Sequence, residues 1–185
     1  MFRVPLERVW GSKRFLIFYL VSGFGAALIQ QGVSLYHVQQ LMNSASGLNV
    51  DWSLVKEAAG LSTDTQLDEI NALLNEVISK SNVSFDLVQQ VFFQYKIPVV
   101  GASGAVFGIL LGFGMLFPNT ELIMLFFPIP IKAKYFVIIY GAIELISGIS
   151  NVPGDNIAHF AHVGGMIFGF ILIKYWQKTD RKHFY

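Results

Sequence analysis

Two residues with the potential for acyl-transfer chemistry each lie near the start of an apolar segment. Ser103 stands in the motif Gly101-Ala102-Ser103-Gly104, and His162 stands in Ala161-His162-Val163-Gly164-Gly165. A serine hydroxyl becomes a useful nucleophile when a neutral imidazole accepts its proton. Polar groups inside long apolar segments are costly and are usually functional. The pattern therefore predicts Ser103 as a nucleophile and His162 as its general base.

The residues around Ser103 predict how the reaction would be supported. Gly101 and Gly104 flank the serine where a helix should begin, and backbone N–H groups at a helix N-terminus stabilise a developing oxyanion. Phe107 follows Ser103 by four residues, on the same helix face. We expect its ring to stack on His162. Apart from Asp155, no acidic residue stands near either motif, which favours a serine–histidine dyad over a triad.

Residues of these types also occur in other kinds of site. His159 and His162 have a spacing that suits a metal pair, but no acidic residue follows in the same segment, so neither a metal nor a cofactor is expected. Ala105 replaces the last glycine of the Gly-x-Ser-x-Gly elbow, which disfavours a soluble esterase. Glu144 is an acidic residue inside another apolar segment, and a functional role and a packing role are equally compatible with that position.

The composition is that of a membrane protein. Hydrophobic residues make up 54% of the 185 residues, and 17 of the residues are Phe. Such a chain is expected to contact the lipid bilayer as an all-α, polytopic helix bundle. The formal net charge of +1 argues against a nucleic-acid partner. The chain has no cysteine, which excludes disulfides and thiolate metal sites.

Apolar runs predict four membrane spans in one domain, 1–185. The expected spans are 15–36, 97–117, 133–149 and 156–176. Glycines recur at intervals of four in two of them. Gly108 and Gly112 continue the series from Gly104, and Gly165 and Gly169 repeat it in the last span. Faces of this kind allow close helix packing, which would bring Ser103 and His162 into one interface.

Charge asymmetry predicts the orientation. Lys and Arg gather at one set of span ends and are usually retained in the cytoplasm, whereas the segment from 47 to 96 is acidic and is expected outside. Within this outer insertion, a capping-box spacing at 63–66 and apolar residues at helical intervals predict an amphipathic helix over about 64–80. Its apolar positions are Leu67, Ile70, Leu74 and Val77. The stretch Val88–Tyr95 is interpreted as an aromatic anchor at the membrane interface.

Together these motifs resemble the rhomboid family of intramembrane serine proteases. The resemblance implies Ser103 as nucleophile, His162 as general base, the Ser103 N–H as an oxyanion donor and Phe107 as the ring against the histidine. It also implies membrane-spanning protein substrates, cleaved near their outer ends. The expected location is a bacterial inner membrane, with the C-terminus in the cytoplasm. The oligomeric state does not follow from the sequence.

One family feature is absent from the sequence. The family core has six membrane helices, and the second carries a His and an Asn one turn apart that complete the oxyanion hole. No His-x-x-x-Asn occurs here, so the chain is expected to begin after that helix. Two hypotheses remain open: an endopeptidase, and a truncated or non-catalytic relative that binds membrane-spanning clients. A transporter is less favoured, because the first two spans offer only isolated polar residues.

Overall fold

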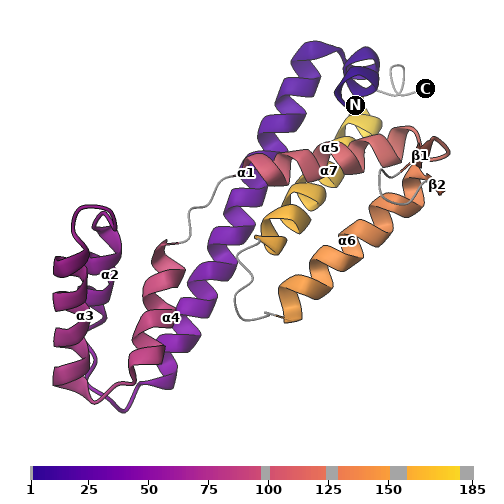
Figure 1. The fold of residues 1–185 in the computed structure, drawn as a ribbon. Coiled ribbons are helices and arrows are strands. Elements are labelled where there is room, and N and C mark those ends of the chain that lie inside the picture. The colour runs from indigo at the N-terminus through magenta and orange to yellow at the C-terminus, as the bar shows by residue number, and fades with distance from the viewer. Residues whose placement is uncertain (1, 97–100, 124–128, 151–157, 180–185) are drawn as a thin grey trace. The chain divides into compact units, whose positions relative to one another are not determined.

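The computed structural model describes residues 2–96, 101–123, 129–150 and 158–179. The chain divides into two compact units, one formed by residues 1–31 and 99–185 (the bundle unit) and the other by residues 32–98 (the insertion unit). The elements in Figure 1 are α1 (Arg3–Ser44), α2 (Trp52–Gly60), α3 (Leu67–Ser81), α4 (Phe85–Lys96), α5 (Ala102–Leu116), β1 (Glu121–Ile123), β2 (Pro130–Lys132), α6 (Ala133–Ser150) and α7 (His159–Thr179). The described chain is thus almost entirely helical, as predicted.

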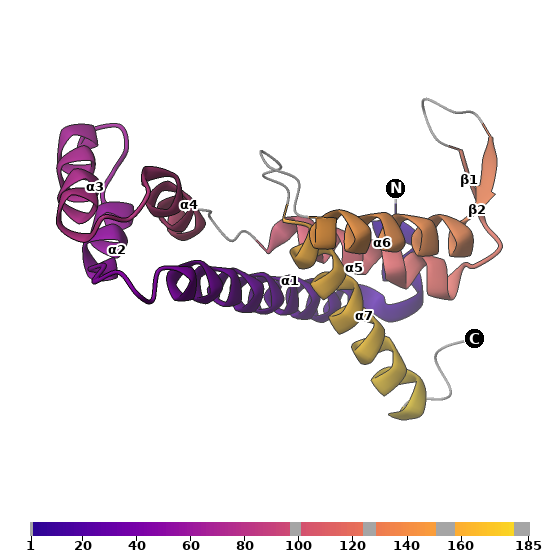
Figure 2. The same ribbon diagram turned by 90° about the horizontal axis from the view of Figure 1, so that it is seen from below.

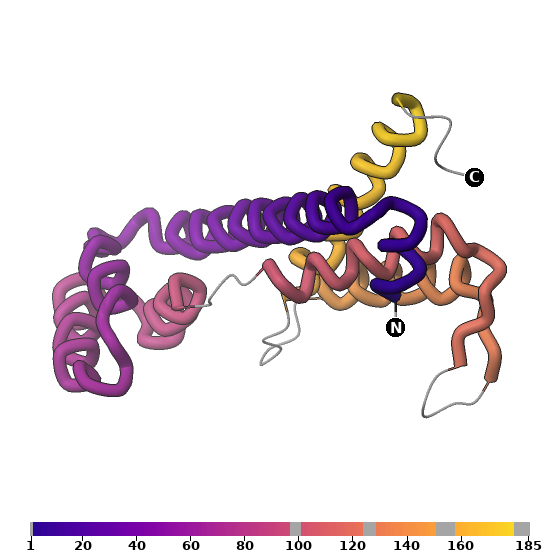
Figure 3. Tube along the Cα trace, turned by 90° about the horizontal axis from the view of Figure 1, so that it is seen from above, coloured from indigo at the N-terminus to yellow at the C-terminus, as the bar shows by residue number. Residues whose placement is uncertain are grey.

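Helix α1 is broken once, close to its start. Gly11 has φ 74° and ψ 160°, a conformation open to glycine and strained for other residues. The two segments on either side of the break run in different directions (Figure 3). Trp10, next to the break, is buried and lies 4.8 Å from the ring of Phe18. The break therefore folds the N-terminal segment onto the core of the bundle unit.

In the bundle unit, α5 packs against α7, and α6 packs against both. Helix α6 overlaps α5 in the view of Figure 2, and in Figure 1 the two helices diverge away from the end that carries β1 and β2. The main buried cluster lies at one end of these helices and consists of Leu6, Trp10, Phe18, Phe113, Leu122, Ala133 and Ile173. Much apolar surface remains outside: Ile138 and Ile146 of α6 are 67% and 63% exposed. Exposed isoleucines of this kind fit a lipid environment better than water.

The predicted spans correspond to helices to different degrees. Range 15–36 lies within α1, 133–149 coincides with α6, and most of 97–117 and 156–176 is covered by α5 and α7. Residues 97–100 and 156–157 lie outside the described residues. Among the described helices, α1 and α6 are long and apolar enough to cross a membrane, and α5 is a shorter apolar helix. Four crossings therefore stay a prediction.

Two short strands, β1 and β2, precede α6. Strands β1 and β2 form an antiparallel pair in which Glu121 faces Lys132 and Leu122 faces Ile131. Leu122 is buried against the bundle cluster, while its neighbours in β1 are exposed. Because side chains alternate along a strand, Leu122 alone of the three β1 residues points inward and anchors the strand pair to the bundle unit.

The insertion unit has its own hydrophobic core. Helices α2, α3 and α4 and the end of α1 enclose buried side chains, which are Val38, Ala45, Val55, Ala58, Ile70, Leu74, Val77, Val83, Val88, Val91 and Phe92. The aromatic-anchor interpretation of Val88–Tyr95 needs correction for its buried residues and stays a prediction for Phe93, which is 54% exposed. In α4, Val88, Val91 and Phe92 are spaced for one helix face and are buried in this core.

The predicted amphipathic helix 64–80 is α3, with two corrections. Ile70, Leu74 and Val77 are buried as expected, but Leu67 is 57% exposed. The capping box is also wrong, because residues 63–65 form a turn and the helix begins only after Gln66. The Gln66 side chain bonds backward, its Oε1 accepting from the N–H of Ser62. The turn residues thus occupy positions that the pattern assigned to the first helical turn.

Candidate active site

Ser103 is the second residue of α5, directly after the first helical residue Ala102. Gly101 stands at the N-cap position, and its carbonyl accepts from the N–H of Ala105. The Ser103 side chain is exposed. Backbone N–H groups in the first turn of a helix have no partner within the helix. Ser103 therefore presents both a hydroxyl and an N–H at the end of α5 that attracts negative charge.

Glycines bring the backbones of α5 and α7 into direct contact beside Ser103. A Cβ placed on Gly104 would meet the Ala161 carbonyl oxygen at 2.6 Å, and one on Gly165 would overlap the Gly104 carbonyl. One turn further, a Cβ on Gly108 would lie 3.0 Å from the Gly165 oxygen, and one on Gly169 3.4 Å from the Gly108 Cα. The two predicted glycine faces oppose each other at these positions. Ser103 and His162 are each adjacent in sequence to residues of this contact.

The third glycine of α5 has a different neighbour. A Cβ on Gly112 would lie 3.2 Å from both Phe18 and Trp10 of α1, so this position packs against α1 instead of α7. The close backbone approach to α7 occurs at Gly104 and Gly108, whereas the nearest atoms at Gly112 belong to α1. Gly112 therefore serves α1 packing.

His162 is held on one side by an aromatic ring. Its imidazole stacks on Phe107, with ring centroids 4.0 Å apart and planes inclined by 10°. Phe107 itself also contacts Tyr140 of α6, with 5.9 Å between centroids. The ring contact that the family resemblance implied is present. It restricts rotation of the imidazole about its side-chain bonds.

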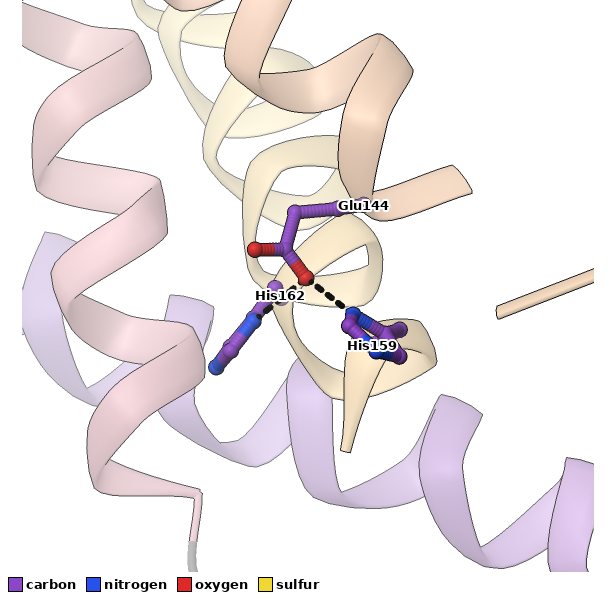
Figure 4. Close-up of side chains that lie close together, drawn as sticks. All are labelled: Glu144, His159 and His162. Carbon is purple, nitrogen blue, oxygen red and sulfur yellow. Dashed lines mark hydrogen bonds and ion pairs between the residues drawn. The ribbon is translucent and has the colours of Figure 1, made fainter. Parts of the chain in front are cut away.

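On another edge, His162 is bonded to a carboxylate that the sequence analysis placed in no site. Glu144 Oε2, on α6, lies 2.8 Å from His162 Nδ1 and 2.7 Å from His159 Nδ1 (Figure 4). The residue is 8% exposed. The expectation that no acid except Asp155 approaches the motifs was therefore wrong, and Asp155 lies outside the described residues.

This contact fixes which imidazole nitrogen is available. A carboxylate oxygen accepts, so Nδ1–H of His162 donates to Glu144. The Nε2 atom is then the nitrogen with a lone pair that can take a proton. Among the described residues, no hydrogen bond joins Ser103 Oγ to His162. Catalytic hydrogen bonds of this type are often long without substrate and shorten in the complex.

The same three side chains have the donor set of a metal site. One ligand atom each of Glu144, His159 and His162 lies within 4.8 Å of the other two. The sequence analysis sought an acid within the helix of the histidines, whereas the acid comes from α6. The signal that could have found it was the unassigned acid in an apolar span.

Comparison with known proteins gives one match. A family model described as Rhomboid domain matches residues 72–178, more than half of the chain, and this range contains Ser103, Glu144, His159 and His162. No curated protein and no solved structure matches.

Proposed function

Because this chain belongs to the rhomboid family, whose members are membrane proteins and generally serine proteases, we propose that it is an intramembrane serine endopeptidase. The observation that carries the proposal is the restraint of His162. Phe107 stacks on the His162 ring, and Glu144 is hydrogen-bonded to its Nδ1. His162 lies on α7, whose backbone contacts α5, the helix that begins beside Ser103. A histidine with only a packing role would not require both a stacked ring and a hydrogen-bonded carboxylate.

The proposed reaction follows from these positions. Nε2 of His162 takes the proton from Ser103 Oγ as the oxygen attacks a peptide carbonyl. The protonated imidazole then donates that proton to the leaving amine, and water hydrolyses the acyl-enzyme with the same base. Glu144 acts as a positioning residue, because its carboxylate holds the Nδ1–H tautomer and stabilises the imidazolium.

Oxyanion stabilisation is assigned to the first turn of α5. The Ser103 N–H and the glycine backbone on either side of it, Gly101 and Gly104, lie at the positive end of the helix. Side-chain donors of the kind that the family places in its second helix do not occur as His-x-x-x-Asn in this sequence. Loss of one such donor costs about 3 kcal/mol of transition-state stabilisation. Slow turnover is therefore expected from these 185 residues alone.

The experiment that tests this function uses a fluorophosphonate probe, which reacts with activated serines, and a membrane-spanning model substrate. Wild-type protein should be labelled and should cleave, while Ser103→Ala and His162→Ala should do neither. His37→Ala is the matched control, since this histidine lies in the insertion unit, and it should behave as wild type. Labelling that persists in Ser103→Ala would exclude Ser103 as the nucleophile.

Glu144 can be tested separately from the nucleophile. Glu144→Ala should lower kcat by about 100-fold or more with little change in KM, because positioning of the base is lost while substrate contacts remain. Glu144→Gln keeps an accepting oxygen and should recover part of the rate. A kcat of Glu144→Ala equal to that of wild type would show that the hydrogen bond to His162 has no part in catalysis.

The absence of His-x-x-x-Asn favours a second candidate function, the binding of membrane-spanning clients without cleavage. The two candidates differ in one observable. A non-catalytic relative would co-purify with a client segment equally well in wild type and in Ser103→Ala, and would cleave it in neither. An endopeptidase would accumulate the intact client only in Ser103→Ala.

We place the insertion unit outside and the C-terminus in the cytoplasm, because the insertion is acidic and basic residues follow the last span. Substrates would then be cut near their outer ends, where water can satisfy the freed backbone groups. In intact cells, Ser79→Cys should react with an impermeant thiol reagent and Thr179→Cys should not. The chain has no cysteine to interfere. The opposite labelling would invert the orientation.

A further inference from the structure

The cluster of Glu144, His159 and His162 contains a second histidine that the orientation of a single base does not require. Orientation of His162 needs one hydrogen bond, but the same carboxylate oxygen also contacts His159 Nδ1 at 2.7 Å. The three side chains are largely shielded, with 10% exposure for Glu144 and 12% for each histidine. The elements that carry them, α6 and α7, pack directly against each other.

The donor set has the composition of a zinc site. Two imidazoles and one carboxylate, with a fourth position open, form a recurrent three-ligand arrangement around Zn²⁺. Bonds of about 2.1 Å in tetrahedral geometry place ligand atoms roughly 3.4 Å apart. The present separations are 2.7 and 2.8 Å for the two oxygen–nitrogen pairs, and all three atoms lie within 4.8 Å. Entry of the ion thus requires the carboxylate oxygen to move back from both nitrogens and the two imidazoles to close around the ion by side-chain rotation.

We propose that Glu144, His159 and His162 bind a divalent transition-metal ion of the Zn²⁺ type, and that the bound ion switches off the base. Three bonds form, from the ion to Glu144 Oε2 and to the Nδ1 atoms of both histidines. Each ring keeps its proton, which moves through solvent from Nδ1 to Nε2. In the metal-bound form, Nε2 of His162 is a donor and cannot take the proton of Ser103.

The inhibitory half of this inference rests on the proposed protease function, whereas metal binding does not. Binding is therefore measured on Ser103→Ala, which keeps all three ligands and needs no activity. The protein is purified in detergent through a tag without histidine and titrated with Zn²⁺ by calorimetry, with Mg²⁺ as a hard-cation control. One Zn²⁺ per chain should bind, and Mg²⁺ should not.

Ligand variants show where the ion binds. Loss of an outer partner of a metal ligand costs 10-fold to 100-fold in affinity, so Glu144→Gln or His159→Gln should weaken Zn²⁺ binding by at least about 100-fold. His37→Gln and His183→Gln remove the other histidines of the chain and should leave the affinity unchanged. Circular dichroism identifies a variant that has not folded, and the remaining ligand variant then decides. Equal affinity in wild type and both ligand variants would overturn the site.

Inhibition is tested on active protein. Zn²⁺ should stop fluorophosphonate labelling of Ser103, a chelator should restore it, and His159→Gln should need at least about 100-fold more Zn²⁺ relative to its own metal-free rate. Labelling that is unchanged or faster with the site full would overturn the inhibitory role. If Zn²⁺ binds Ser103→Ala but the wild type neither cleaves nor labels, the metal site stands and the protease function fails.

Discussion

Helices α6 and α3 bury opposite kinds of side chain. In α6, Ile138 and Ile146 are exposed and Glu144 is buried. In α3, Ile70 and Leu74 are buried, while the acidic residues of its first turn face outward. Helix α6 exposes apolar side chains and buries a carboxylate, which is favourable in apolar surroundings. Helix α3 exposes carboxylates and buries apolar side chains, which is favourable in water. The two units of the chain are therefore built for two solvents.

The two units also differ in the interactions that hold their helices together. Apolar side chains packed against lipid gain little from burial, so the bundle unit relies on close backbone contact at Gly104 and Gly165. The insertion unit relies on a core of Val, Leu and Ile side chains, as a water-soluble domain does. This difference predicts which substitutions each unit tolerates.

The largest effect is expected at the glycine contact. Gly165→Ala would place a Cβ on the Gly104 carbonyl, and because backbone faces backbone, the helices must separate. We expect a loss of more than about 3 kcal/mol in stability, above the usual range for overpacking, with loss of activity. The thermal midpoint in detergent is the measurement. Gly32→Ala has nothing within 4 Å and is the control, expected to gain about 0.5 kcal/mol.

A charge on the exposed face of α6 tests the difference in solvent directly. Ile138→Asp should disfavour membrane insertion of α6 by about 3 kcal/mol, measured as the inserted fraction by protease protection in vesicles. Leu67→Asp is the matched change in α3, at a position that is 57% exposed, and should leave folding and insertion as in wild type. Equal insertion of the Ile138→Asp and wild-type chains would mean that α6 does not face lipid.

Truncation of an isoleucine side chain should cost more stability in the insertion unit than on the exposed face of α6. Ile70, 2% exposed, belongs to the core of the insertion unit, and Ile70→Ala should destabilise that unit by about 2 kcal/mol or more. Ile146→Ala removes the same atoms from an exposed site of α6 and should cost much less. Hydrogen exchange of the amides in α2, α3 and α4 reports the first change. Comparable costs at both positions would contradict the separation into two kinds of core.

The sequence predicted the contacts between α5 and α7, because each of these helices carries its own spaced motif. Phe107 follows from the four-residue helical spacing, and the glycine contacts follow from repeated intervals of four. Glu144 was noticed but given no partner, because its bonds to His159 and His162 cross from α6 to α7, and α6 has no glycine series like those of α5 and α7. The metal-ligand set was missed for the same reason.

The insertion unit shows a second limit of sequence reasoning. Helix α3 has 15 residues and a clear apolar period, so it was found with a small error at its start. Helix α2 has nine residues with Val55 and Ala58 buried, too few turns for a period to emerge. Helix α4 has aromatic residues on both its buried and exposed sides, which masked the inward face of Val88 and Val91.

The smallest expected effect concerns the start of α2 in the insertion unit. Asp51 caps this helix, accepting from the backbone N–H of Ser53 at 3.1 Å and from its hydroxyl at 2.5 Å. The Ser53 hydroxyl, followed by its backbone N–H, lowers the pKa of Asp51 below the ordinary value. A carboxyl whose folded-state pKa is depressed contributes stability above its unfolded pKa of about 3.9, and this stability is lost as the pH falls through the folded value.

Protection of the α2 amides against hydrogen exchange, corrected for the intrinsic pH dependence, should therefore fall below about pH 4 in wild type. Asp51→Asn keeps an accepting oxygen but cannot titrate, so its protection should follow the same curve without this fall. Glu57→Gln, an exposed carboxyl of α2 that accepts no hydrogen bond from the described residues, should retain the wild-type fall. Helix α5 of the bundle unit should show no matching change, because its N-cap residue, Gly101, has no carboxyl group. A loss of protection in all helices at the same pH would mean that the two units unfold together.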